Sequence, residues 1–133
     1  HDVLLHLTRQ DSFGLVILEA MKAGMAIISS TQYAIPEMVQ DGYNGYLVDN
    51  KYEFFNKRNV PNESVWNNRS KTIYKEYLDE NVIERVKEKV NVIINDRQIL
   101  TQLRINSWNK AKYGEFSEEY IKGKWKELYD IYL

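Results

Sequence analysis

Residues 11–19 read DSFGLVILE, with a carboxylate at each end and a glycine ahead of an apolar run. The run predicts a helix over residues 13–23 that ends at Gly24. A glycine at the mouth of a helix lets a ligand approach the backbone, and the N–H groups there favour an anion such as phosphate. Asp11 and Glu19 can accept hydrogen bonds from hydroxyl groups. The stretch therefore indicates a site for an anionic, hydroxyl-rich ligand such as a nucleotide sugar.

Three short apolar runs surround this helix, at residues 3–7, 26–30 and 45–48. Each is bounded by polar residues or glycine, which is typical of strands buried on both faces of a parallel sheet. Residues 36–40 form a short predicted helix opened by Pro36. The alternation predicts an α/β fold with a partial Rossmann-like parallel sheet of about three strands. Such a sheet has open edges, so we expect neighbouring strands to come from elsewhere.

The chain divides into three parts by its pattern. Residues 1–50 carry the βαβαβ unit, and residues 51–78 form a polar, aromatic-containing excursion that we expect to turn helical near Ser70. The excursion's aromatic side chains either cover the neighbouring core or form a partner surface, and the first interpretation is favoured. Its two Asn-x-Ser matches, at Asn62 and Asn68, are interpreted as chance matches to the glycosylation pattern.

Residues 79–133 predict three amphipathic helices that pack on the rest of the domain. The last one begins near Ser117, a good N-cap residue. Their apolar stripes are Val82, Ile83, Val86, Val90 and Ile93; Ile99, Leu100, Leu103 and Ala111; and Ile121, Trp125, Leu128 and Tyr132.

Composition restricts the partners. The chain has 133 residues, is 44% hydrophobic and lacks cysteine, which fits one globular domain in a reducing, cytoplasmic setting. Only Arg9 and Lys22 are basic within residues 1–50, against six acids, so a bound diphosphate would depend on helix N–H groups and on upstream residues. There is no basic stripe, and we expect no nucleic-acid partner. No apolar stretch reaches the length of a transmembrane segment.

Glu19 is the firmer of the two acidic candidates. Leu15 and Glu19 are four residues apart on one helix face, about 6 Å along the axis, which suits a phosphate at the helix mouth and a ribose one turn on. Because its sequence neighbours are apolar, we expect them to enclose the carboxylate, which argues for a ligand rather than an ordinary surface glutamate.

Asp11 has two compatible roles, as a helix cap or as a ligand contact, and Ser12 could cap the helix instead. His1 and His6 have no second ligand at metal spacing and are interpreted as structural. No Ser-His-Asp, Cys-His or P-loop pattern is present, so hydrolase and NTPase functions lack support.

The segment at residues 11–24 resembles the E-x7-E segment of retaining glycosyltransferases with the GT-B fold, the glycosyl transferases group 1, or family 4. Residues 35–39 (IPEMV) and 41–48 (DGYNGYLV) are similar to two further segments of that family, in the same order and spacing. The C-terminal helices also resemble the family's tail. The similarity is close over residues 1–50 and loose over residues 80–133.

This resemblance implies the C-terminal donor-binding part of an enzyme that transfers a hexosyl group from an NDP-sugar, with retention of configuration. The acceptor, of unknown identity, would be held by a missing N-terminal domain, which could also place the protein peripherally at a membrane. It implies synthesis of a polysaccharide or glycoconjugate, with neither metal nor cofactor, and no residue is assigned a catalytic role. The implied donor-binding residues are Asp11, Ser12, Phe13, Gly14, Leu15, Val16 and Glu19, the backbone N–H groups of residues 13–16 facing the sugar and diphosphate.

Two residues depart from the family pattern. The first acid is Asp11 where glutamate is usual, and Tyr33-Ala34 replaces the usual Gly-Gly before Ile35-Pro36-Glu37. These changes predict an altered donor preference or weaker binding, and the chain begins within a predicted strand, as a piece of a longer polypeptide would. The alternative is a non-catalytic interaction or regulatory module that keeps the fold. A sugar-nucleotide epimerase is disfavoured because no G-x-G-x-x-G follows a strand.

Overall fold

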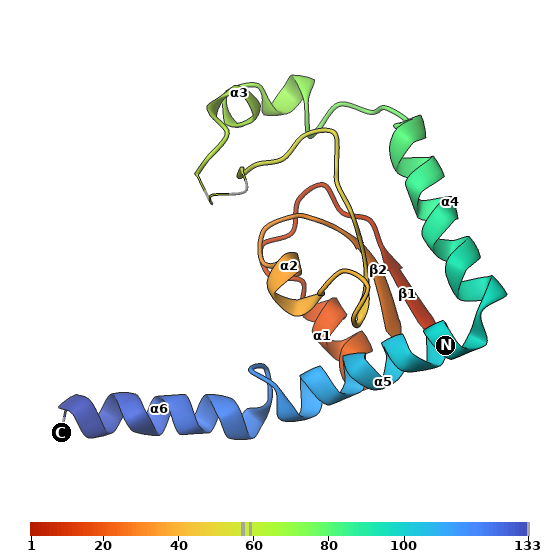
Figure 1. Cartoon of the computed structure of the whole chain (residues 1–133). Helices are drawn as coiled ribbons and strands as arrows, with labels where there is room; N and C mark the ends of the chain where they lie inside the picture. The colour runs from red at the N-terminus through yellow and green to blue at the C-terminus, as the bar shows by residue number, and fades with distance from the viewer. Residues whose placement is uncertain (57, 59, 133) are drawn as a thin grey trace.

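A three-stranded parallel sheet forms the centre of the molecule (Figure 1). The computed structural model describes residues 1–56, 58 and 60–132. The strands lie in the order β1-β2-β3, and the predicted α/β class is confirmed. Their bounds are β1, Val3–His6; β2, Ala26–Ser30; and β3, Gly45–Val48.

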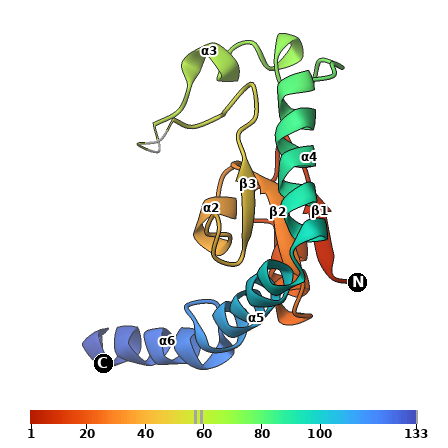
Figure 2. The same ribbon diagram turned by 45° about the vertical axis from the view of Figure 1, so that its right-hand side comes forward.

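The central strand β2 is buried along its whole length, because helices cover both faces of the sheet (Figure 2). Ile27 packs with α1 (Leu15–Lys22) and α2 (Ile35–Met38) on one face. Ala26 and Ile28 point to the other face, against α4 (Glu80–Asn95) and α5 (Arg97–Tyr113). Within the described residues β1 pairs with β2 alone, and Leu5 is 54% exposed at this edge of the sheet. The expected burial on both faces therefore holds for β2 and not for β1.

The excursion has a small hydrophobic core of its own, centred on Phe54, Val65 and Ile73. It contains a one-turn helix that the sequence pattern did not predict, α3 (Glu63–Trp66), and a 3₁₀ turn, η1 (Arg69–Lys71), close to the expected helical start at Ser70. Tyr52, Phe54, Phe55 and Trp66 pack on one another and on Tyr33 in the loop after β2, rather than over the core that flanks the sheet, while Tyr74 is 60% exposed.

The C-terminal helices differ in whether they pack on the sheet. Asp79 and Asp96 accept hydrogen bonds from the first N–H groups of α4 and α5, and both helices pack on the sheet. The last helix begins after Ser117, whose hydroxyl accepts from the Tyr120 N–H, as its sequence predicts. Their bounds are α4, Glu80–Asn95; α5, Arg97–Tyr113; and α6, Glu118–Tyr132.

The packing expected of α6 is not found in the structure. The helix extends away from the body of the molecule (Figure 1) and buries none of its residues. Trp125 in its apolar stripe is 55% exposed. Over the described part of the chain, no helix combines the length and apolar character needed to cross a membrane.

Candidate functional site

The loops that follow the three strands meet at one edge of the sheet. Because the strands are parallel, their carboxyl ends share this edge, where ligands bind in open α/β sheets. Several hydrogen bonds join the loops, among them those that Thr8 O accepts from Ser30 Oγ at 2.6 Å and from Asn50 Nδ2 at 2.8 Å. The candidate residues from the first loop are thus brought next to the loops after β2 and β3.

Asp11 closes the loop that leads into α1. Its Oδ1 accepts hydrogen bonds from the N–H groups of Gly14 (2.9 Å) and Phe13 (3.3 Å), and its Oδ2 lies 3.2 Å from Nε2 of His6. Asp11 therefore has a local structural role, and its ligand contact stays a prediction. His6, interpreted as structural from the sequence, is the residue that orients the second oxygen. Ser12 does not cap the helix, because the N-cap residue is Gly14, which has no side chain to do so.

The mouth of α1 differs from the expected one by two residues. The helix begins at Leu15 rather than near Phe13, because Gly14 has a left-handed backbone with φ of 80°. A Cβ on Gly14 would lie 3.3 Å from Cδ1 of Ile17, so the position is also tightly packed. The N–H groups of Phe13 and Gly14 already donate to Asp11. The N–H groups of Leu15 and Val16, at the start of the helix, have no acceptor within it and remain available to a ligand.

Glu19 is exposed, and the prediction that apolar neighbours enclose it is wrong. Helical geometry turns Ile17, Ala20 and Met21 into the core, so residues adjacent in sequence lie on the opposite face. Glu19 shares the outer face with Leu15, which is 66% exposed. A ligand that extends from the helix mouth along this face can therefore reach the carboxylate.

Neither of the two basic residues within residues 1–50 is placed to bind an anion at the mouth of α1. Arg9 donates to Lys75 O at 2.8 Å and to Tyr77 O at 2.9 Å, and its guanidinium lies 4.1 Å from the centre of the Tyr77 ring. Lys22 lies in the last turn of α1, at the far end of the helix. The positive end of the α1 dipole is the remaining source of attraction for an anion among these elements.

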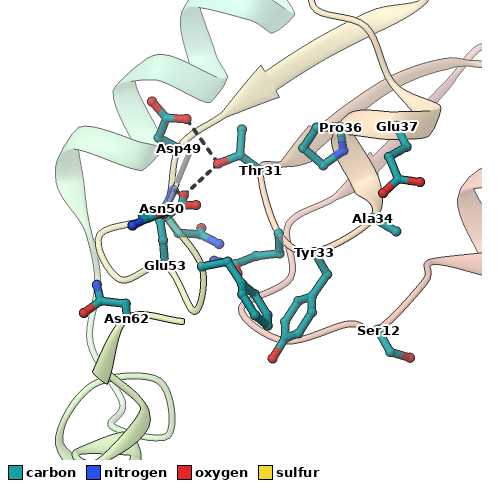
Figure 3. Close-up of a pocket in the computed structure, with 13 residues that line it drawn as sticks. Ser12, Thr31, Tyr33, Ala34, Pro36, Glu37, Asp49, Asn50, Glu53 and Asn62 are labelled. Carbon is teal, nitrogen blue, oxygen red and sulfur yellow. Dashed lines mark hydrogen bonds between the residues drawn. The ribbon is translucent and has the colours of Figure 1, made fainter. Parts of the chain in front are cut away.

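A pocket of about 820 Å³ opens beside the helix mouth (Figure 3). Ser12 contributes to it from the first loop, and the remaining walls come from residues 31–37 and from the segment after β3. The sequence reasoning did not find this pocket. The sequence features that could have indicated the pocket are the unusual Tyr33-Ala34 pair and the aromatic and asparagine residues of the excursion.

Tyr33 has a left-handed backbone with φ of 49°, a conformation that favours glycine. Its ring is held by Phe54 and Phe55, each with a ring centroid 5.4 Å away. Burial raises the pKa of the Tyr33 hydroxyl above its ordinary value, an effect that nearby Tyr74 increases and Arg69 opposes. Tyr33 therefore adopts a backbone conformation that glycine favours, although the residue is tyrosine.

The described residues contain no group of three or more His, Cys, Asp or Glu side chains placed to hold a metal ion. The site consists of a helix mouth, two carboxylates and a polar-aromatic pocket.

The described part of the chain has the fold of the C-terminal domains of GT-B glycosyltransferases, with a parallel sheet and C-terminal helices. Residues 1–58 match the model of the family Glycosyl transferases group 1, so this segment of the chain is similar to that family.

Two curated proteins are similar in sequence. The N-acetyl-alpha-D-glucosaminyl L-malate synthase of Bacillus anthracis is 33% identical over 101 residues, which cover 76% of this chain and 24% of that protein. An uncharacterized 41.2 kDa protein in the cps region of Klebsiella pneumoniae is 43% identical over 49 residues, 37% of this chain and 14% of that protein. The chain thus spans about a quarter or less of the length of these relatives.

Solved structures share the fold at low sequence identity. The C-terminal domain of the group 1 glycosyl transferase LpcC from Francisella tularensis has a TM-score of 0.58 and 20% identity, covering 88% of this chain and 44% of that one. Anabaena Alr3699/HepE, in complex with UDP-glucose, has a TM-score of 0.62 and 22% identity, covering 97% of this chain and 27% of that one.

Proposed function

We propose that this chain binds the nucleotide-sugar donor of a retaining glycosyltransferase, with the diphosphate at the mouth of α1 and the ribose on Glu19. The sugar would pass to an acceptor held by an N-terminal domain. The observation that carries the proposal is the exposed face of α1, where the open N–H groups of Leu15 and Val16 stand one turn from the Glu19 carboxylate. The match of residues 1–58 to the family model and the UDP-glucose complex of HepE support the choice of ligand.

In this arrangement different groups of the chain would bind different parts of the ligand. The helix dipole and the two open N–H groups would attract the diphosphate, in place of basic side chains. Glu19 would accept hydrogen bonds from both ribose hydroxyls, which a carboxylate can do with its two oxygens. Asp11 would hold the loop in shape through the Phe13 and Gly14 N–H groups while His6 positions its second oxygen.

Replacement of Glu19 tests the ribose contact. We expect Glu19→Ala to weaken UDP binding about tenfold, because two hydrogen bonds to a charged acceptor are lost. Calorimetry or amide chemical shifts of the 15N-labelled chain would measure the change. Glu88→Ala, which removes an exposed glutamate from α4, is the matched control and should bind UDP as the parent chain does.

A ligand lacking the ribose 2′- and 3′-hydroxyls makes this test specific. The parent chain should discriminate against the dideoxy form of UDP, and Glu19→Ala should bind both forms alike, because the partner of the hydroxyls is gone. Equal UDP affinity in Glu19→Ala and the parent chain would refute the ribose role and favour the non-catalytic module.

A further inference from the structure

Arg9 ties the loop after β1 to the end of the excursion. Its Nη1 donates to Lys75 O at 2.8 Å and to Ile73 O at 3.4 Å, and its Nη2 donates to Tyr77 O at 2.9 Å. Carbonyl groups at alternate positions of one irregular segment thus converge on a single guanidinium, whose planar fork of donors suits such a set. The Tyr77 ring completes the contact, with its centre 4.1 Å from the guanidinium carbon.

The segment that Arg9 holds has little main-chain structure of its own. Residues 75–78 belong to no helix or strand, and among the described residues no backbone–backbone hydrogen bond joins them to another segment. The Tyr77 ring packs edge-on against the ring of Tyr52, with centroids 5.8 Å apart. A segment held by so few main-chain contacts opens at low cost once the guanidinium is released.

The beginning of the excursion is fastened to the same loop. Thr8 O accepts a hydrogen bond from Asn50 Nδ2 at 2.8 Å, and Asn50 immediately precedes the excursion. Two consecutive residues, Thr8 and Arg9, therefore hold both ends of residues 51–78. The position of the loop after β1 and the position of the excursion are thus set together.

The loop that carries Arg9 leads directly into the proposed donor site. Asp11 follows Arg9 by two residues and accepts from the Gly14 N–H at 2.9 Å, at the mouth of α1. Residues 9–12 lie in neither a helix nor a strand, so a diphosphate held at the Leu15 and Val16 N–H groups would restrict their motion. Binding that orders a loop favours every contact that depends on the same order.

We propose that Arg9 is a positioning residue that couples the excursion to the donor site. Its guanidinium holds residues 73–77 against the loop before α1 while that loop is ordered, and it touches no ligand itself. The inference deepens the proposed function and rests on it for the ligand, a nucleoside diphosphate. Because coupling between two sites is reciprocal, a nucleotide at the mouth of α1 stabilises the closed excursion by the same factor by which the closed excursion raises nucleotide affinity.

Trypsin cleavage of the bond between Lys75 and Glu76 measures how often the held segment opens. The protease must take the Lys75 carbonyl oxygen into its oxyanion hole, so the hydrogen bond from Arg9 has to break before cleavage. The cleavage rate then follows the population of the open segment. In the parent chain we expect saturating UDP to slow this cleavage about fivefold, the lower end of the range for coupled sites. Cleavage after Lys126, in α6, is the internal reference and should not change.

Arg9→Lys separates the fork of donors from the positive charge. Lysine keeps the charge and the trypsin site at this position, but it lacks the planar guanidinium that reaches several carbonyls at once. The variant should be cleaved faster after Lys75, should bind UDP about fivefold more weakly, and should lose the effect of UDP on cleavage. Arg97→Lys, which changes an exposed arginine at the start of α5, is the matched control and should behave as the parent chain does.

Amide chemical shifts of residues 13–19 in the 15N-labelled chain report UDP binding independently of the excursion. If UDP shifts these residues but does not slow cleavage after Lys75 in the parent chain, the coupling is overturned and the proposed function stands, a comparison that needs no variant. Cleavage that UDP slows equally in Arg9→Lys would overturn the role of Arg9. UDP that leaves residues 13–19 unshifted would refute the proposed function and the coupling with it.

Discussion

Gly45→Ala should lower the free energy of unfolding by about 3 kcal/mol or more, an effect at the upper end of that expected for overpacking. An added Cβ would collide with the carbonyl oxygen of Ile27 and lie 3.0 Å from its Cβ. Ile27 pairs directly with Gly45 in the β2–β3 ladder, so the clash falls on backbone that cannot rotate away. The two strands would have to separate at the buried centre of the sheet.

Urea denaturation of the two proteins would measure this loss. Gly123→Ala is the matched control, since Gly123 lies in α6 and an added Cβ there would meet no atom within 4 Å. It should leave stability unchanged or raise it by up to about 1 kcal/mol, because alanine is the better helix former. A Gly45→Ala protein as stable as the parent chain would show that β2 and β3 are not paired in this register.

Phe54→Ala should lower the free energy of unfolding by about 3–5 kcal/mol, the range measured when large buried aromatic side chains are replaced by alanine. Phe54 is fully buried, and its ring centroid lies 4.9 Å from that of Trp66. Because its cluster is separate from the two clusters that flank the sheet, we expect the loss to fall on the excursion. Amide hydrogen exchange should accelerate in α3 and in the segment held by Arg9, while β2 keeps its protection.

Phe54→Leu is the milder comparison. It keeps much of the side-chain volume and should lower the free energy of unfolding by less than about 1.5 kcal/mol. If exchange accelerated equally in β2 and in α3, the excursion would be part of a single cooperative unit with the sheet.

The order of elements follows from the sequence because each signal is local. Short apolar runs bounded by polar residues predicted all three strands, and Ser117 predicted the start of the last helix. The start of α1 was placed early because the left-handed Gly14 interrupts the helix, and a glycine's conformation is not visible in its letter. For α6, an apolar stripe says which face can pack and not whether a partner is present.

The candidate site was predictable in position and less so in detail. The acids Asp11 and Glu19 do bracket a helix mouth, but the burial of Glu19 was inferred from sequence neighbours that point the other way. His6 contacts Asp11, and Arg9 donates hydrogen bonds to the carbonyl oxygens of Lys75 and Tyr77. These contacts depend on how the loops meet in space, which the sequence pattern does not show. The pocket wall depends on the excursion folding back on Tyr33, which no local pattern encodes.

The most direct test of the donor-site proposal is a crystal structure of this chain with UDP-glucose. The proposal predicts the diphosphate at the Leu15 and Val16 N–H groups, and the two ribose hydroxyls at hydrogen-bond distance, about 2.6–3.2 Å, from the oxygens of Glu19. A nucleotide bound elsewhere, or a ribose turned away from Glu19, would contradict it.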